Sequence, residues 1–214
     1  MNHSQPLLVE VPTCAFRPYA SREYQDTFPV PTPSSVYGML LSLIGVPREE
    51  KARHRGAEMA LAVEQLPGRS KVFRKLRRGS DLEDTRPDYQ DLLMDLRLWV
   101  WLGRGTDYAT PCLADRVIEA LRRPETISRC GGLSLGESSY LVDAISVQST
   151  APERLVFLIP DRAGFYSLPV WVDHTASRNT IPVRFRFSEP SSVEAELKSA
   201  WFRIGAAHDA PARG

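Results

Sequence analysis

Basic residues are concentrated between positions 69 and 78, in a segment without acidic residues. Its cations are Arg69, Lys71, Arg74, Lys75, Arg77 and Arg78. In an extended strand alternate residues share a face, so the odd-numbered ones, with Phe73 among them, would line one side. Such a strip suits a phosphodiester backbone, which cations bind without reading its sequence, and Phe73 could add a stacking surface. A solvated hairpin, paired with the acidic residues at 81–88, explains the same pattern equally well.

Two further segments offer groups that bind anions. The glycine-rich turn at 131–138 exposes backbone N–H groups and hydroxyls, which can hold phosphates. A plain connection after a helix explains that turn more simply. Ser34 and Ser35 stand at the start of a predicted helix, where an anion would be stabilised. An ordinary capped helix is again the simpler interpretation.

Catalytic signatures are sparse. Neither His-x-x-x-His nor Cys-x-x-Cys occurs, so the sequence predicts no metal site and no cofactor. Residues 132–136 match the Gly-x-Ser-x-Gly nucleophile motif, but that motif needs a strand before it and a helix after it. The pattern here predicts the reverse order, so we interpret the match as chance. Metal-independent RNA cleavage needs only a general base and a charge stabiliser, which leave no motif, so it stays open.

The net charge, the cysteine count and the apolar content limit the classes of protein to which this chain can belong. The net charge of +1 excludes a nucleic-acid binder that is basic all over, although a local basic face remains possible. The three cysteines are odd in number and form no metal-like pair, which predicts a reduced, cytoplasmic compartment with the cysteines in the core. No apolar run is long enough to cross a membrane.

The helices and strands that must position these groups are predicted in the order of an α+β fold. Strands are predicted at 7–11, 60–64, 96–102 and 141–147. The first helix is expected from Pro33 to Gly45, with Thr32 as its N-cap, and a second helix from Thr110-Pro111. This βαββαβ order is that of the ferredoxin-like or RNA-recognition plan. Additional C-terminal strands are predicted at 155–159, 166–172 and 181–187, so we expect a core at 1–150 and a β extension at 151–214.

Two segments carry a family resemblance. The run from Thr27 to Gly45, with its proline-rich lead, Ser-Val-Tyr-Gly step and aliphatic helix, resembles the N-terminal signature of the Cas-five family of CRISPR-associated RAMP proteins. Residues 135–138 and 141–143 look like that family's glycine loop and following strand. The resemblance is clear over about residues 7–47 and 112–147.

The resemblance implies a subunit of a type I, Cascade-like effector complex that binds and caps the 5′ handle of the guide RNA. Its implied partners are this RNA, the CRISPR backbone subunit, the large subunit and, indirectly, target DNA near its flanking motif. A basic hairpin thumb inserted at about 66–92 would press on the RNA with the cations given above. The implied handle contacts are Arg17, Tyr19, Arg22, Pro33, Ser34, Ser35, Tyr37, Gly131, Gly132, Ser134, Leu135, Gly136, Glu137 and Ser138.

One subtype of the resembled family cuts precursor RNA with a tyrosine, a lysine and a histidine, the last two adjacent. This chain has no Lys-His pair, since its lysines are at 51, 71, 75 and 198. The sequence therefore favours a subunit that is not an enzyme, and a metal-independent endoribonuclease that processes guide RNA is the alternative.

Overall fold

The computed structural model describes residues 5–18, 25–77, 85–129 and 131–207. Its framework is a nine-stranded sheet, in which all the named strands pair antiparallel. The strand order is β5-β1-β4-β2-β6-β8-β7, with β3 paired to β4 and β9 paired to β2. The first four of these strands are β5 (Ala144–Val147), β1 (Leu7–Cys14), β4 (Thr85–Gly103) and β2 (Glu58–Val63). The others are β6 (Val156–Pro160), β8 (Ile181–Phe187), β7 (Tyr166–Trp171), β3 (Gly68–Arg77) and β9 (Phe202–Arg203).

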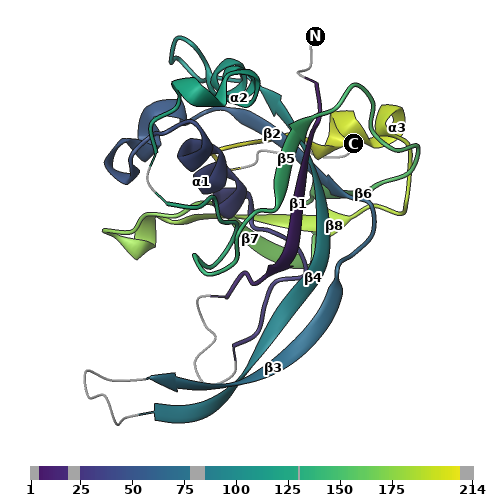
Figure 1. The fold of residues 1–214 in the computed structure, drawn as a ribbon. Helices are drawn as coiled ribbons and strands as arrows, with labels where there is room; N and C mark the ends of the chain where they lie inside the picture. Colours follow the sequence, from purple (N-terminus) through teal and green to yellow (C-terminus); the bar gives the residue numbers. More distant parts are fainter. Residues whose placement is uncertain (1–4, 19–24, 78–84, 130, 208–214) are drawn as a thin grey trace.

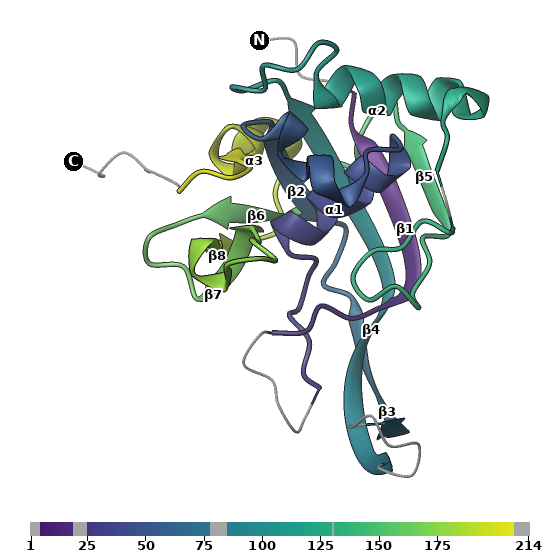
Figure 2. The same cartoon turned by 90° about the vertical axis from the view of Figure 1, so that its left-hand side faces the viewer.

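Helices cover both faces of this sheet because its strands alternate apolar side chains between two cores. Figure 2 shows α1 (Pro33–Leu43) and α2 (Leu113–Arg122) on the same side of the sheet. There Leu98 and Val100 of β4 belong to the larger core. Trp99 and Trp101 point to the other face, where α3 (Val193–Ala200) covers a smaller core.

Helix α1 forms where local signals predict it. The Thr32 side chain accepts a hydrogen bond from the Ser35 N–H, and Pro33 occupies the first turn, where its missing N–H costs nothing. The helix ends before Gly45, whose φ of +69° is accessible to glycine without strain. The described residues also form three short 3-10 helices, at Arg48–His54, Pro124–Thr126 and Ser177–Asn179.

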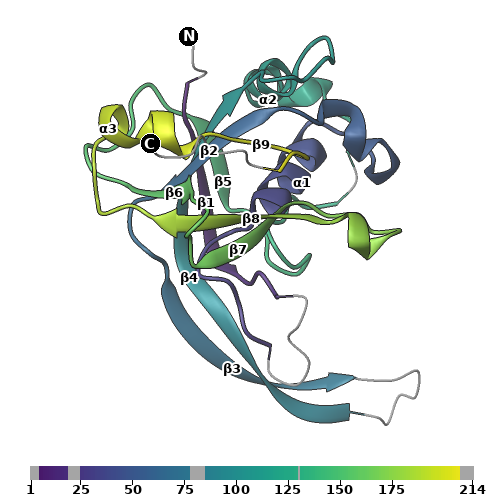
Figure 3. The ribbon, with the colours of Figure 1, turned by 180° about the vertical axis from the view of Figure 1, so that it is seen from behind.

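The predicted strands all appear, but β4 is far longer than its apolar segment. It runs for 19 residues and pairs with β3 in a hairpin that projects from the body of the protein (Figures 1 and 3). Thr85–Asp91, which includes Asp88 of the acidic stretch, belongs to this strand, within the predicted insertion at about 66–92. Helix α2 begins at Leu113 rather than at Thr110-Pro111, and α3 and β9 were not predicted.

Two of the three cysteines lie in the core, as predicted. Cys14 and Cys112 are free and buried, and Cys130 lies outside the described residues. Burial raises the pKa of the Cys14 thiol to about 12. In the part of the chain that the structure describes, no helix combines the length and apolar character needed to cross a bilayer.

Candidate nucleic-acid interface

A groove of about 690 Å³ brings together residues from all three predicted handle contacts. We call it the turn groove. Arg17 comes from the loop after β1, Ser34 and Ser35 from the start of α1, and Gly136 and Glu137 from the glycine turn. Arg17 and Gly136 are more than 100 residues apart in the sequence, so only the tertiary fold brings these segments into one surface.

The start of α1 supplies the anion-binding end of this groove. Thr32, the N-cap, is almost fully buried, and its hydroxyl lies 3.2 Å from Ser34 Oγ and 2.8 Å from Ser35 Oγ. The first turn of α1 has no acidic residue. The partial positive charge of the helix N-terminus is therefore not neutralised within its own first turn.

The glycine turn is held as a compact loop. Leu135 N–H donates to the Tyr140 carbonyl at 3.3 Å, and Val142 N–H donates to the Leu133 carbonyl at 2.8 Å. Leu133 and Leu135 are buried, whereas Gly136 and Ser138 are exposed. Buried leucines anchor the turn while its tip faces the solvent.

The hairpin of β3 and β4 contacts the glycine turn through its inner face. Gln90 Nε2 donates to both carboxylate oxygens of Glu137, at 3.1 Å each. The Arg74 guanidinium lies over the Tyr140 ring, 5.8 Å from its centroid. Burial raises the pKa of the Tyr140 hydroxyl, and the Arg74 charge opposes this shift. These contacts connect the arm to the turn groove.

The outer face of the hairpin carries an exposed aromatic pair. Phe73 and Tyr89 are register partners on β3 and β4, with ring centroids 5.2 Å apart. Their side chains are 64% and 51% exposed, although aromatic rings of this size are usually buried. Two exposed rings on a cationic arm provide a surface on which unpaired bases can stack.

Part of the basic strip is neutralised by acids of the fold. Arg69 forms ion pairs with Asp26 at 2.9 Å and Asp91 at 3.2 Å, and it also donates to the Thr27 carbonyl. Arg69 is therefore paired with acids, but not with those that the hairpin alternative named. Its partners lie outside the acidic stretch at 81–88.

The remaining predicted contacts fall into three groups. The side chains of Pro33, Tyr37 and Leu135 are buried, so they support the surface instead of forming it. Gly131, Gly132, Ser134 and Lys71 are described but do not line the turn groove. The backbones of Lys75 and Arg77 belong to β3, and Tyr19, Arg22 and Arg78 lie outside the described residues.

Sequence reasoning missed one wall of the turn groove. Ser167 of β7, Arg178 and Thr180 also line it, and none of them was predicted as a contact. Arg178 lies in the 3-10 helix at Ser177–Asn179, and its side chain is exposed. A single arginine in a short turn has no motif, so no sequence signal could have singled it out.

The body of the protein holds a buried pair of titratable side chains beside an arginine. His54 and Asp107 form a fully buried pair, with Nδ1 and Oδ2 2.8 Å apart. Arg116 lies 3.1 Å from His54 Nε2, so this nitrogen accepts and Nδ1 donates to Asp107. Among the described residues, no group of three or more His, Cys, Asp and Glu side chains could hold a metal ion. Residues 132–136 follow α2 and precede β5, as predicted, which is the reverse of the nucleophile motif.

Comparisons with known proteins agree with the resemblance seen in the sequence. A family model described as CRISPR-associated protein (Cas_Cas5) matches residues 7–188. A "CRISPR-associated protein Cas5" of Myxococcus xanthus (strain DK1622) is 36% identical over 185 residues, covering 81% of this chain and 85% of that protein.

Solved structures share the fold at lower identity. One chain of a "CRISPR RNA-guided surveillance complex" superposes with a TM-score of 0.60 and 16% identity, over 87% of this chain and 90% of that one. A "Crystal structure of Cas protein" gives a TM-score of 0.51 and 19% identity, over 88% and 96%. On the family match and the 36% identity, this chain belongs to the Cas5 family of CRISPR-associated proteins.

Proposed function

We propose that this chain is a non-catalytic subunit of a type I CRISPR effector complex that binds and caps the 5′ handle of the guide RNA. The observation that carries this proposal is the turn groove, where Arg17, the start of α1 and the glycine turn meet. Its donors are a helix N-terminus, serine hydroxyls and arginine side chains, which suit the phosphates of an unpaired, bent RNA strand. One chain of a CRISPR RNA-guided surveillance complex shares the fold, which supports the proposal further.

The proposal also assigns a role to each part of the sheet. The strand order β5-β1-β4-β2, with α1 and α2 on one face, supports a ferredoxin-like core over about residues 1–150. The β3–β4 hairpin is the thumb, and its exposed Phe73 and Tyr89 contact bases where the handle meets the rest of the guide. Strands β6, β8 and β7 continue the sheet and form the C-terminal extension at 151–214.

The partners follow from this role. The guide RNA lies in the turn groove, and the protein joins the CRISPR large subunit to the backbone subunit. Target DNA near its flanking motif is contacted only indirectly, through the large subunit. We place the complex in the cytoplasm, because the free, buried Cys14 and Cys112 suit a reducing compartment.

Ribonuclease activity is the alternative, because Tyr37, Lys51 and His174 line one groove. Their arrangement is poor for catalysis. The Tyr37 hydroxyl donates to the Lys51 carbonyl at 2.6 Å, and burial raises the pKa of this hydroxyl further above its ordinary value. The tyrosine is thus held as a structural donor instead of acting as a base. Incubating the purified chain with repeat RNA in EDTA separates the two functions, since only a metal-independent nuclease would cut it.

Crosslinking tests the binding proposal directly. The chain would be purified with the proteins it assembles with, irradiated, and its RNA-linked peptides identified. We expect the 5′ end of a guide RNA to crosslink to residues 131–138 or to the hairpin at 68–77. Crosslinks confined to other parts of the guide, or a complex without RNA, would contradict the capping role.

A further inference from the structure

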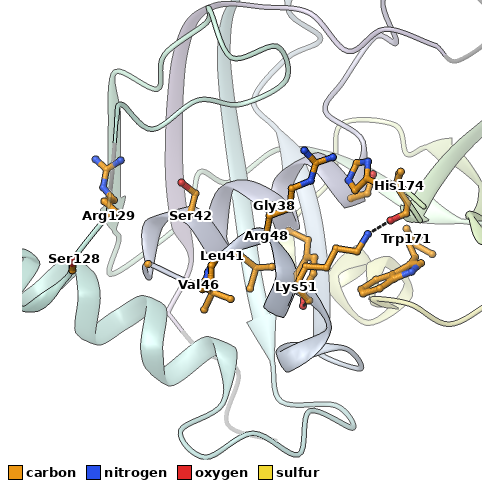
Figure 4. Close-up of a pocket in the computed structure, with 16 residues that line it drawn as sticks. Gly38, Leu41, Ser42, Val46, Arg48, Lys51, Ser128, Arg129, Trp171 and His174 are labelled. Atoms are coloured by element: carbon orange, nitrogen blue, oxygen red, sulfur yellow. Dashed lines mark hydrogen bonds between the residues drawn. The ribbon is translucent and has the colours of Figure 1, made fainter. Parts of the chain in front are cut away.

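A second groove, which we call the helix groove, follows the exposed side of α1 (Figure 4). Its volume is also about 690 Å³. It meets the turn groove at Ser34 and Val172, which line both. In Figure 4 Arg48, Lys51 and His174 gather at one end, and Arg129 stands at the other end beyond Ser42. Ser34 and Tyr37, two of the implied handle contacts, line this groove, but the cations at its two ends are not among those contacts.

The residues that line the helix groove carry positive charges and no negative charge. None of the 16 described residues that line it is acidic. Among the described residues, Arg48, Lys51 and Arg129 form no ion pair, although the charge of Asp173 acts on both Lys51 and His174. Lys51 donates to the Val172 carbonyl, which fixes its position at the edge of the groove (Figure 4). The lining of the groove therefore carries a net positive charge, which would attract a negatively charged occupant.

The floor of the helix groove is aliphatic and open. Leu41 and Val46 line it between the two cationic ends (Figure 4), and Val170 also belongs to its lining. Gly38 lies in the middle of α1, and a Cβ placed there would meet no atom within 4 Å. Glycine inside a helix costs free energy relative to alanine, and packing does not explain its presence at this position. The open floor leaves room for an apolar side chain of a ligand.

A single-stranded nucleic acid fits this floor poorly because the groove has no free aromatic face. Bases bound without pairing usually stack on aromatic rings. The aromatic side chains that line the groove are Tyr37 and Trp171, and both are buried. Lys51 and Arg55 already lie over the Trp171 ring, at 4.7 and 5.0 Å from its centroid. Aliphatic side chains, unlike bases, need no such face.

We propose that the helix groove docks an acidic segment of a partner polypeptide, in which carboxylates flank aliphatic side chains. The aliphatic groups occupy the floor beside Gly38 and Leu41. The carboxylates meet Arg48 and Lys51 at one end and Arg129 at the other. This goes beyond the proposed RNA function and does not depend on it, since it uses a different surface and a ligand of different chemistry.

A defined probe tests the charge and the floor together. Binding of a fluorescein-labelled peptide, Glu-Leu-Glu-Glu-Leu-Glu, to the full chain would be followed by fluorescence anisotropy. We expect it to bind about tenfold more tightly than the same peptide with glutamine in place of glutamate. Combined Arg48→Glu and Arg129→Glu reversal should remove this preference. The matched reversal of the exposed Arg104 and Arg162 should change binding by less than about twofold.

A second variant fills the floor without weakening the helix. Gly38→Leu places a better helix former at an open position, so the Tm should not fall. Peptide affinity should fall about tenfold because the side chain occupies the docking space. Unchanged peptide binding in both variants would overturn the proposal, as would equal binding of the acidic and amide peptides.

Crosslinking in the assembled complex identifies the natural occupant. A photoreactive amino acid at Ser42, which lines the groove, should capture a polypeptide segment with acidic residues beside aliphatic ones. Capture of RNA alone, of a neutral or basic segment, or of nothing would refute acidic docking. Arg178→Gln in the turn groove should leave peptide binding unchanged, so failure of the RNA proposal can be told apart from failure of this one.

Discussion

Gly136 lies so close to the backbone of Ala15 that a Cβ at this glycine would come within 2.4 Å of the Ala15 carbonyl oxygen. The same Cβ would lie 3.0 Å from the Phe16 ring, and Gly136 has a φ of +92°. This approach presses the glycine turn against the end of β1. Ala15, Phe16 and Gly136 all line the turn groove, so the contact also sets the width of the proposed RNA site.

The first prediction concerns this contact. Gly136→Ala should destabilise the fold by roughly 2–4 kcal/mol, since it combines backbone strain with a clash against backbone atoms that cannot move aside. RNA affinity should fall as well, because the turn must shift. Urea unfolding and filter binding with a handle RNA would measure the two effects.

Gly131 offers a matched control for Gly136. Its φ of +78° is also positive, but a Cβ there meets nothing within 4 Å. Gly131→Ala should therefore cost only the backbone strain, about 1 kcal/mol. Equal destabilisation by the two alanines would show that the contact with Ala15 has no energetic importance.

Local signals in the sequence predicted the parts of the fold that local interactions determine. Thr32 and Pro33 marked the start of α1, and Gly45 marked its end, because capping depends on neighbours within one turn. The length of β4 could not be predicted in this way. Asp88 and Gln90 are polar yet buried, because tertiary contacts such as that between Gln90 and Glu137 bury them.

The sequence predicted the separate segments of the candidate site, but no local signal predicted that the fold brings them together. The positive charge of the basic strip could be predicted from the sequence. Its pairing could not, because Asp26, which pairs with Arg69, lies 43 residues away. The glycine turn was selected by family resemblance, since physical reasoning alone favoured a plain connection. Arg178 was missed, because one arginine without a motif becomes meaningful only when β7 and β8 place it beside α1.

The second prediction is that Arg178 binds RNA. Arg178→Gln should weaken binding of a handle RNA by about tenfold, since one charge-assisted hydrogen bond to phosphate contributes about 1.5 kcal/mol or more. Arg184→Gln is a suitable control, because this exposed arginine lies on the same C-terminal strands but does not line the groove. Equal losses in both variants would indicate a diffuse effect of charge, and no loss in either would remove Arg178 from the site.

The third prediction tests the cations of the hairpin. Replacing Arg74, Lys75, Arg77 and Arg78 together with glutamine should weaken RNA binding and flatten its salt dependence. For a single strand, each lost phosphate contact should reduce the slope of log K against log salt by about 0.7. Glutamine at four remote positions, Arg104, Arg122, Arg162 and Arg184, is the matched control. A slope that stays unchanged in the hairpin variant would count against RNA contact there.

The fourth prediction distinguishes the contribution of Phe73 to RNA stacking from its contribution to the stability of the fold. Phe73 is mostly exposed, so Phe73→Ala should change the free energy of unfolding by less than about 1 kcal/mol. The affinity for RNA should nevertheless fall by about 1–3 kcal/mol, the usual contribution of one stacked base. Phe73→Tyr keeps a ring at this position and should bind normally. Loss of binding in the tyrosine variant would exclude stacking as the reason.

The fifth prediction uses His174 as a reporter of the helix groove. Burial lowers the pKa of His174 below its ordinary value of 6.5, and the charges of Lys51 and Arg48 add to this shift while Asp173 opposes it. Because the folded value lies below the unfolded one, the stability from this group is present above pH 6.5. It is lost as the pH falls through the folded pKa.

An acidic ligand in the helix groove should reverse the shift, because its carboxylates stabilise the imidazolium. Histidine resonances followed by NMR should therefore show a higher pKa for His174 when the acidic peptide is bound. By linkage, the peptide should bind more tightly as the pH falls from about 7.5 to 5.5, a range in which its glutamates remain mostly ionised. His174→Gln should remove this dependence while leaving Arg48 and Lys51 in place. If the pKa of His174 is the same with and without the peptide, the carboxylates do not lie at this end of the groove.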